Sequence, residues 1–228
     1  IIGLVAAWLL IGRFREFTQL DIDIVGAGSI LADAEIMCVL ADAMEALGIP
    51  RGSYSVQVND RRILNGLMEK ARVSADKEVV VLRALDKLDR LGPEGVRLLL
   101  GPGRRDEGSE KGEGDFTKGA ELEPDQIDTL MAFLDVPGDA RQGYLAALAE
   151  LVSGTKDGDL GVKAMTELDE ILSERGVEPD RVLFNPAIVR GLAYYTGPVV
   201  EVVLTFEVED GQEKRRFGSV AGGGRYDG

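Results

Sequence analysis

The chain has 228 residues, a length that suits one domain of ordinary size or a core with a smaller insertion. Hydrophobic residues make up 45% of it and charged residues 29%, which is typical of globular proteins and excludes disordered and membrane-spanning classes. The formal net charge of −14 argues against nonspecific binding of nucleic acid, because such binding requires a broad basic surface. A nucleic-acid partner would have to contact local arginines or another domain.

Two residue counts restrict the possible chemistry. The chain contains no histidine, which excludes Ser–His and Cys–His triads, histidine-ligated zinc and an imidazole base within this polypeptide. The single cysteine, Cys38, cannot form a disulfide within the chain, and its apolar helical surroundings favour a buried structural thiol. We therefore expect a cytoplasmic protein without a bound metal, whose acid–base chemistry uses carboxylates, tyrosines or the substrate.

The N-terminal part of the chain begins with an apolar run, Ile1–Ile11, that is too short to cross a bilayer and lacks the basic leader of a signal peptide. It predicts a buried strand or an abnormal terminus, and no membrane partner. In the next segment apolar residues alternate with Gln19, Asp21 and Asp23, which predicts a strand with these three polar side chains on one face. The pattern alone favours a half-solvated antiparallel strand.

Clear boundary signals follow in the middle of the first hundred residues. The helical spacing of apolar residues over Ile30–Leu47, with glycine and proline just beyond, predicts an amphipathic helix. The alternation in Tyr54–Val58 predicts a second strand. Asp60 is placed to cap a helix that runs through Lys70.

The remaining elements form a long helical stretch followed by strands. Composition predicts helices at Val79–Leu91, Asp125–Leu134, Gly143–Val152 and Leu160–Arg175, a charged glycine-rich loop at Gly101–Pro124, and strands at Val182–Phe184, Val199–Val208 and Phe217–Ala221.

This order predicts an α+β fold in which an antiparallel sheet is flanked by helices and interrupted by a helical insertion. We expect residues 1–60 and 177–228 to form the core and residues 61–176 to form a mostly helical subdomain. The order disfavours a doubly wound fold. The chain contains no Walker-type phosphate loop, and three successive glycines alone are more often a tight turn than a nucleotide site.

Two segments near the C-terminus carry more specific residues. Residues 189–197 read VRGLAYYTG and residues 221–228 read AGGGRYDG. Both resemble the two histidine-specific signatures of histidyl-tRNA synthetases, and residues 12–26, GRFREFTQLDIDIVG, resemble the second half of motif 2 of that class II family. The three segments occur in the order of the family. The resemblance extends over nearly the whole chain from Gly12 onward, and implies the class II catalytic sheet with a helical insertion.

The resemblance implies a pocket for free L-histidine. Gln19 would accept a hydrogen bond from the α-ammonium group, and Asp23 would accept one from an imidazole nitrogen. Tyr195 would reach the other ring nitrogen, and Tyr226 would border the polar end of the amino acid. Two further residues complete this predicted pocket: Tyr194, and Gly223 in a glycine run that lets the backbone approach the ligand.

The resemblance also implies ATP-dependent activation of histidine to histidyl-adenylate and its transfer to tRNA(His). Arg190 would be the catalytic arginine beside the α-phosphate and the carboxylate, although the sequence alone favours a surface or ion-paired arginine there. Arg13 and Arg15 would also bind ATP. The implied cofactors are ATP and Mg²⁺ as cosubstrate with no tightly bound group, and the implied partners are histidine, tRNA(His) and a second copy in a homodimer.

Several departures from the family pattern lead us to expect an incomplete catalytic fragment. Position 193 is Ala where an acidic residue is usual, and Ile1–Ile11 contains no arginine where motif 2 has its ATP-binding one. Motif 1, motif 3 and an anticodon-binding domain are not found in the chain. We expect the isolated fragment to be nearly inert in adenylation. The alternative is the regulatory subunit of ATP phosphoribosyltransferase, an inactive relative that binds histidine as an effector, and a third interpretation is an interaction module built on a degenerate synthetase domain.

Overall fold

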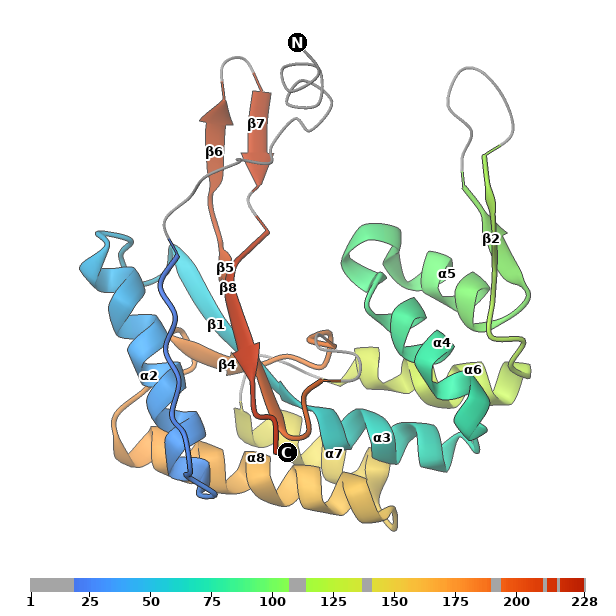
Figure 1. Ribbon diagram of the computed structural model, residues 1–228, viewed down its shortest axis with the longest axis horizontal. Helices are drawn as coiled ribbons and strands as arrows, with labels where there is room; N and C mark the ends of the chain where they lie inside the picture. The colour runs from blue at the N-terminus through green and yellow to red at the C-terminus, as the bar shows by residue number, and fades with distance from the viewer. Residues whose placement is uncertain are drawn as a thin grey trace.

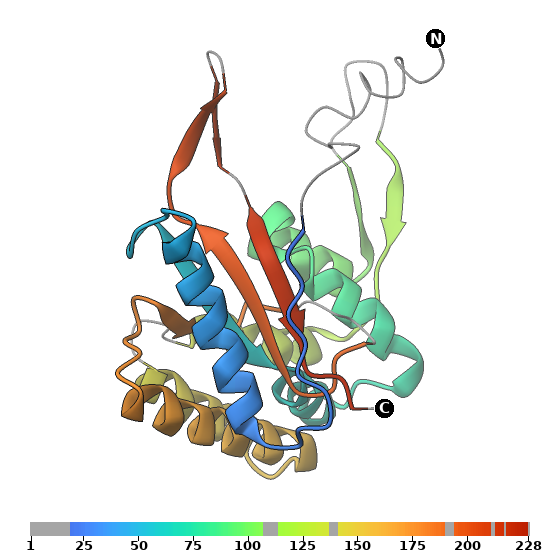
Figure 2. The ribbon, with the colours of Figure 1, turned by 60° about the vertical axis from the view of Figure 1, so that its left-hand side comes forward.

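The computed structural model of the chain describes residues 19–106, 114–136, 141–189, 194–210, 213–216 and 218–227. Its centre is a four-stranded sheet with helices packed against it, and a second group of helices stands beside this core (Figure 1). A rotated view shows the same arrangement (Figure 2). The chain enters α2 at the lower end of this view, on the side of the molecule where the C-terminus lies. The mixture of a sheet with segregated helices confirms the predicted α+β class.

The sheet has the strand order β4-β1-β5-β8. β5 runs antiparallel to both β1 and β8, as predicted, whereas β4 runs parallel to β1, so the sheet is mixed. The register pairs Val56 with Val202 and Val58 with Val200, and all four valines are almost completely buried. The strands are β1 Tyr54–Asp60, β4 Val182–Phe184, β5 Pro198–Leu204 and β8 Ser219–Gly224.

Four helices pack around this sheet. α2 and α8 both contact β1 and β5, and α3 and α7 pack against α8. The buried valines of the sheet belong to one hydrophobic cluster with residues of these helices, such as Met37 and Leu168. The helices are α2 Ile30–Ala46, α3 Arg61–Lys70, α7 Arg141–Val152 and α8 Lys156–Glu174.

The start of α3 confirms the predicted helix cap. Asp60 has extended backbone angles, and its Oδ1 accepts a hydrogen bond from the backbone N–H of Arg62 at 2.9 Å. A side-chain oxygen at this position satisfies a donor that the first turn of a helix leaves free. The helix ends at Lys70, as the sequence predicted.

The second group of helices forms a lobe beyond α3, which contains α4, α5, α6 and two short strands (Figure 1). The predicted loop at Gly101–Pro124 was partly wrong, because it contains the antiparallel pair β2–β3. At Gly103 a side chain would meet the Thr117 carbonyl oxygen, so this pairing depends on glycine. The elements are α4 Ala75–Leu85, α5 Leu88–Leu100, β2 Gly103–Arg105, β3 Phe116–Lys118, α6 Pro124–Met131 and the 3₁₀ helix η1 Ala132–Asp135.

Two strand predictions differ from the structure. The predicted strand Val199–Val208 is divided at Thr205 and Phe206 into β5 and β6 Glu207–Asp210, and β6 forms a separate two-stranded ribbon with β7 Glu213–Arg216. The predicted strand at Arg15–Val25 is wrong for residues 19–25, the part of it that the structure describes. This segment pairs with no strand of the described residues, and Leu20 and Val25 are exposed at 75% and 91%. Alternation alone cannot make a strand, because a strand needs a hydrogen-bonding neighbour.

The predicted domain limits, at residues 61 and 176, stay a prediction. In the structure α3, α7 and α8 lie between these limits and belong to the hydrophobic core around the sheet. The helices of the second lobe, α4 to α6, lie between α3 and α7 in the chain. Across the described ranges, no helix has the length and apolar character required to cross a membrane.

Candidate amino acid site

The two C-terminal signature segments meet at one end of β5 and β8. The backbone N–H of Thr196 donates to the Arg225 carbonyl oxygen at 2.8 Å, and the N–H of Arg225 donates to the Pro198 carbonyl oxygen at 2.8 Å. The Thr196 hydroxyl also donates to Asp227 Oδ2 at 3.0 Å and accepts from the backbone N–H of Asp227 at 2.9 Å, which joins the two segments further. These bonds extend the β5–β8 ladder past the ends of the strands, so the residues around Tyr195 and Tyr226 are held together.

Three of the predicted site residues form an aromatic cluster here. The ring of Tyr194 lies 5.3 Å from that of Tyr195, edge to face, and 5.1 Å from that of Tyr226. Tyr194 and Tyr226 are 62% and 54% exposed, whereas Tyr195 is half-buried. Such a cluster offers flat apolar faces and hydroxyl groups to solvent, which suits a small ligand with a planar ring.

Glycines let the backbone pass close to this cluster. A Cβ atom on Gly224 would lie 2.8 Å from Cγ and Cδ1 of Tyr195. At Gly223, the predicted site residue, a Cβ would find only Val200 Cγ1, at 4.0 Å. The glycine that the packing of the tyrosine requires is therefore Gly224, a distinction that the run of three glycines in the sequence did not reveal.

Arg225 lies between the two signatures and was missed as a site residue. Its Nη2 and Nε donate to the Asp33 carboxylate at 2.6 and 3.1 Å, and Nη2 also donates to the Ser29 carbonyl oxygen at 2.8 Å. Nη1 donates to the Ala27 carbonyl oxygen at 3.3 Å and is 3.5 Å from Asp227 Oδ1. The hydrogen bond with Asp33 raises the pKa of the Arg225 guanidinium, so its charge is secure.

A second buried ion pair lies close to the first. Asp60 is fully buried and accepts hydrogen bonds from Nη2 and Nε of Arg62 at 2.6 and 2.9 Å. Burial raises the pKa of the Asp60 carboxyl group, an effect that Arg62 opposes and the negative charge of Asp33 adds to. The end of β1 and the start of α2 thus share one group of charges, formed by Asp33, Asp60, Arg62 and Arg225.

The end of β1 is also tied to the segment that leads to residue 190. The side-chain amide of Asn59 donates to the carbonyl oxygens of Pro186 and Ile188 at 3.1 and 3.0 Å, and its own oxygen accepts from the Tyr144 hydroxyl. These bonds satisfy polar groups within the core. They hold the chain just ahead of the VRGLAYYTG signature in a fixed position.

Arg61 lies beside the same signature. Its backbone N–H donates to the Gly197 carbonyl oxygen at 2.9 Å, and the residue is only 9% exposed. Within the described ranges, its buried Nη1 atom has no hydrogen-bond partner. Burial lowers the pKa of this guanidinium, and the charge of Glu78 partly opposes the effect. Arg61 belongs to none of the sequence motifs, so the sequence did not indicate it as a site residue.

The other predicted site residues are not brought into the cluster by any described contact. Gln19 and Asp23 lie on the exposed segment 19–25, where the amide of Gln19 donates to Asp21 Oδ1 at 2.6 Å. Their predicted shared strand face is absent because the segment is not a strand. Arg13, Arg15 and Arg190 lie outside the described residues.

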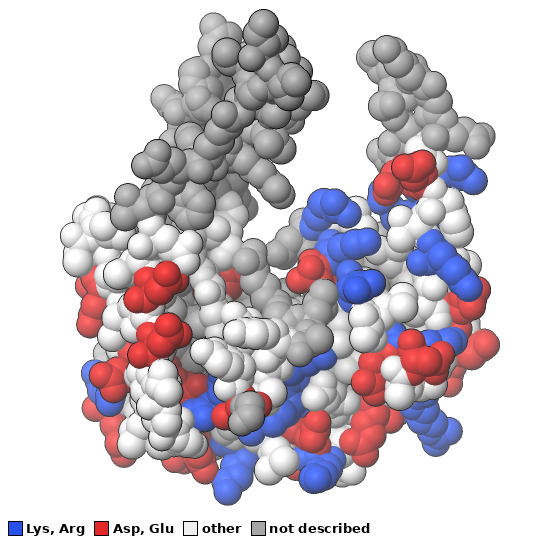
Figure 3. Space-filling model, viewed as in Figure 1, with Lys and Arg blue, Asp and Glu red and all other residues white. Residues whose placement is uncertain are grey.

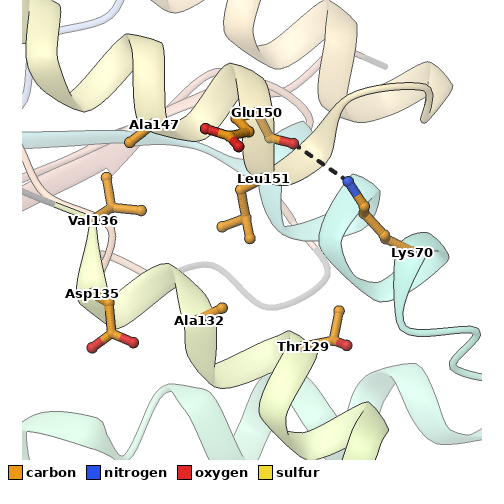
Figure 4. A pocket seen from close by; sticks show the side chains of 8 residues that line it. All are labelled: Lys70, Thr129, Ala132, Asp135, Val136, Ala147, Glu150 and Leu151. Carbon is orange, nitrogen blue, oxygen red and sulfur yellow. Dashed lines mark hydrogen bonds between the residues drawn. The ribbon is translucent and has the colours of Figure 1, made fainter.

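No group of three or more metal-ligating Asp, Glu or Cys side chains is present in the part of the chain that the structure describes. A shallow hollow of about 400 Å³ lies elsewhere, between α3, the α6–η1 segment and α7. Figure 4 shows that its lining combines apolar and polar side chains, with Lys70 donating to the Glu150 carbonyl oxygen at 3.4 Å. None of its lining residues is a predicted site residue.

Comparisons with known proteins extend these findings. A family model described as histidyl-tRNA synthetase matches residues 10–228. Histidine–tRNA ligases of Cereibacter sphaeroides and Rhizobium rhizogenes are each 50% identical to this chain over 95% of its length. The chain spans 44% and 43% of those two proteins.

Solved structures show the same fold at lower identity. A histidyl-tRNA synthetase from Nostoc sp. PCC 7120 is 22% identical with a TM-score of 0.63, over 89% of this chain and 47% of that one. A protein from Bacillus halodurans C, described as an ATP phosphoribosyltransferase regulatory subunit/histidyl-tRNA synthetase, is 21% identical with a TM-score of 0.65 over 89% of this chain and 44% of that one.

Proposed function

The chain belongs to the histidyl-tRNA synthetase family, and from this premise we propose that it forms part of the site that activates L-histidine with ATP and transfers it to tRNA(His). The observation that supports this most directly is the aromatic cluster at the end of the β5–β8 ladder. The three tyrosines come from two separate signature segments, yet the ring of Tyr194 lies 5.3 Å from that of Tyr195 and 5.1 Å from that of Tyr226.

Histidine would bind by pairing each of its polar groups. The Tyr195 hydroxyl would reach one ring nitrogen, and the Asp23 carboxylate would accept a proton-bearing nitrogen on the other side. Gln19 would accept from the α-ammonium group. A site built for these groups rejects analogues that lack them, since each unpaired buried group costs about 1 to 3 kcal/mol.

Activation would join the histidine carboxylate to ATP. A carboxylate oxygen would attack the α-phosphorus, the bond to the bridging oxygen would break, and pyrophosphate would leave. The Mg²⁺ that accompanies ATP would neutralise part of the negative charge of the phosphates. We assign charge stabilisation in this step to Arg190, and ATP binding to Arg13 and Arg15. In the second step a terminal ribose hydroxyl of tRNA attacks the carbonyl carbon, and AMP leaves.

The tRNA partner requires local basic residues, since the chain as a whole is acidic. Basic side chains gather where α4 and α5 meet, on the side of the lobe toward the sheet (Figure 3). Arg83, Lys87 and Arg90 lie along this stretch, and Arg83 is exposed. We propose that this patch contacts phosphates of the tRNA. We also propose that the protein acts as a homodimer in the cytoplasm.

The test is histidine-dependent exchange of pyrophosphate into ATP, together with single-turnover formation of histidyl-adenylate, in the complete natural polypeptide that carries these residues. We expect both activities, and we expect Arg190→Ala and Arg190→Lys to slow adenylate formation by about 10²-fold or more with a much smaller change in histidine affinity. Lysine rescues poorly because it lacks paired planar donors.

Two results would contradict this proposal. Histidine binding without adenylate formation by the unaltered protein would favour the regulatory paralogue. Equal losses of rate and histidine affinity in the Arg190 variants would assign that arginine to ground-state binding. The 228-residue chain assayed alone is expected to be nearly inert, and turnover at a rate typical of intact enzymes would contradict that expectation.

A further inference from the structure

We propose that Arg225 is a positioning residue that assembles the two halves of the histidine pocket. Its backbone belongs to the half that carries the tyrosines, and its side chain holds the chain that leads from Gln19 and Asp23 into α2. This inference rests on the proposed function, because it assumes that those residues bind histidine. It adds to that function a residue whose own side chain need not touch the substrate.

The backbone contacts place Arg225 within the tyrosine half. Its N–H donates to the Pro198 carbonyl oxygen and its carbonyl oxygen accepts from the N–H of Thr196, both at 2.8 Å. Thr196 follows Tyr195 directly, and Tyr226 follows Arg225 directly. Any displacement of the Arg225 backbone therefore moves at least two tyrosines of the cluster.

The side-chain contacts reach the other half of the pocket. Arg225 donates to the carbonyl oxygens of Ala27 and Ser29 at 3.3 and 2.8 Å and to the Asp33 carboxylate at 2.6 Å. Within the described ranges, these contacts join residues 19–33 to the C-terminal signature. Only Ile24, Val25 and Gly26 separate Asp23 from Ala27.

A turn between the exposed segment 19–25 and α2 makes this contact decisive for Asp23. Gly26 has a φ of +79°, a left-handed conformation that glycine adopts without strain. Ser29 then caps α2 by accepting from the N–H of Leu31. Because Arg225 fixes the carbonyl groups on the α2 side of this turn, it sets where the exposed segment leaves the core.

The geometry requires arginine at this position. Side-chain exposure is 14% for Arg225 and 10% for Asp33, so the pair is largely shielded from water. The guanidinium reaches Asp33 with two nitrogens and still has donors for two carbonyl oxygens. Lysine has a single nitrogen on a flexible stem and cannot reach all these acceptors at once.

The chain offers a matched control in another arginine–aspartate pair. Arg51 contacts Asp180 with Nη2 and Nε at 2.7 and 3.1 Å, nearly the same two-nitrogen geometry as Arg225 with Asp33. The control side chains are 49% and 52% exposed, and neither residue is part of the candidate site. A general effect of replacing a paired arginine by lysine should appear in both pairs, whereas a positioning effect should appear only in the Arg225 pair.

The experiment compares Arg225→Lys, Asp33→Asn and Arg51→Lys with the unaltered protein, all in the complete natural polypeptide. Measured for each are the KM values for histidine and ATP and the kcat in pyrophosphate exchange, histidine affinity by calorimetry, and Tm. We expect Arg225→Lys to raise the KM for histidine about 10-fold or more, with the KM for ATP changed by less than about 2-fold. Arg51→Lys should leave both KM values unchanged.

Asp33→Asn keeps the carbonyl contacts of Arg225 and serves as the milder variant if Arg225→Lys does not fold. It should raise the KM for histidine selectively, and the effects of the two substitutions should not add, because they break the same pair. A lower Tm with an unchanged KM for histidine, or equal rises in the two KM values, would overturn the proposal. Absence of histidine-dependent exchange in the unaltered protein would instead reject the proposed function.

Discussion

Two buried arginine–aspartate pairs in this molecule have similar surroundings but serve different parts of it. Arg141 and Asp169 join α7 to α8 at 2.5 Å, and Arg141 also donates to the carbonyl oxygens of Val182 and Val177. Arg225 and Asp33 are buried to a similar extent, and Arg225 likewise donates to two backbone carbonyl groups. The first pair connects elements of the core, whereas the second connects the halves of a candidate ligand site.

The comparison shows that burial and hydrogen bonding alone do not indicate what an ion pair is for. In both pairs a guanidinium donates to backbone carbonyl oxygens as well as to a carboxylate, and losing the arginine would cost free energy at each of these acceptors. Only the elements that each arginine connects distinguish the two. Substitutions should therefore separate them by which quantity changes, the free energy of unfolding or the affinity for histidine.

The largest expected effect is on the core pair. Arg141→Ala leaves the buried Asp169 charge without its partner and removes donors from two carbonyl groups, so the free energy of unfolding should fall by about 3 to 5 kcal/mol. Urea unfolding measures this, and Arg51→Ala at the exposed pair is the control, with a much smaller loss because water screens that pair. An equally small loss for Arg141→Ala would mean that water or a shifted side chain compensates for it.

The next effect concerns the exposed segment of the site. Asp23→Ala should reduce the affinity for histidine by about 1.5 to 3 kcal/mol, because a charge-assisted hydrogen bond is lost. Stability should change by less than about 0.5 kcal/mol, since the residue is exposed and outside the core. Calorimetry with histidine and thermal unfolding provide the two quantities. Unchanged histidine affinity would return Asp23 to the role of a solvated surface residue.

A smaller effect distinguishes two neighbouring glycines. Gly224→Ala places a Cβ 2.8 Å from the ring of Tyr195, so it should displace the tyrosine, cost about 1 to 3 kcal/mol of stability and weaken histidine binding. Gly223→Ala meets no atom closer than 4.0 Å and should change stability by less than about 0.5 kcal/mol. Loss of histidine affinity in Gly223→Ala at unchanged stability would support the predicted contact of that residue with the ligand.

The smallest effect is a pH dependence at the second ion pair of the site. Because burial raises the pKa of Asp60 in the folded state, the folded protein holds this proton more tightly than the unfolded chain does. Stability contributed by protonated Asp60 is therefore present below the ordinary pKa of 3.8 and is lost as the pH rises through the higher folded value. As the pH rises through that range, the unaltered protein should lose more unfolding free energy than Asp60→Asn, which has no carboxyl group to titrate at this position. A difference that moves the other way would show that Arg62 outweighs burial.

Part of the fold follows from local chemistry and was predictable. The helix at Ile30–Ala46 has apolar residues at helical spacing and stop signals just beyond its end, and α3 begins at the predicted cap, Asp60. The same local information predicted the strand beginning at Tyr54. Each of these signals lies within a few residues of the feature it predicts, so no long-range contact is needed to read it.

The family signatures likewise identified the tyrosines of the candidate site. The motifs alone predicted Tyr194, Tyr195 and Tyr226 as site residues, and in the folded chain their rings lie together. Histidine contacts by these residues, and by Gln19, Asp23 and Gly223, stay predictions. The comparisons confirm the family that the motifs indicated.

Other features depend on partners that lie far apart in the chain, and only the tertiary structure decided them. Alternation over Arg15–Val25 predicted a strand, but residues 19–25, the described part, pair with no strand of the described residues. The contact between Arg225 and Asp33 joins residues 192 positions apart, and no local pattern announces it. Which of three glycines must lack a side chain depends on where the Tyr195 ring packs. Sequence by itself determined the elements with local signals and the family, whereas the pairing of distant groups required the folded chain, because hydrogen bonds and packing form between neighbours in space.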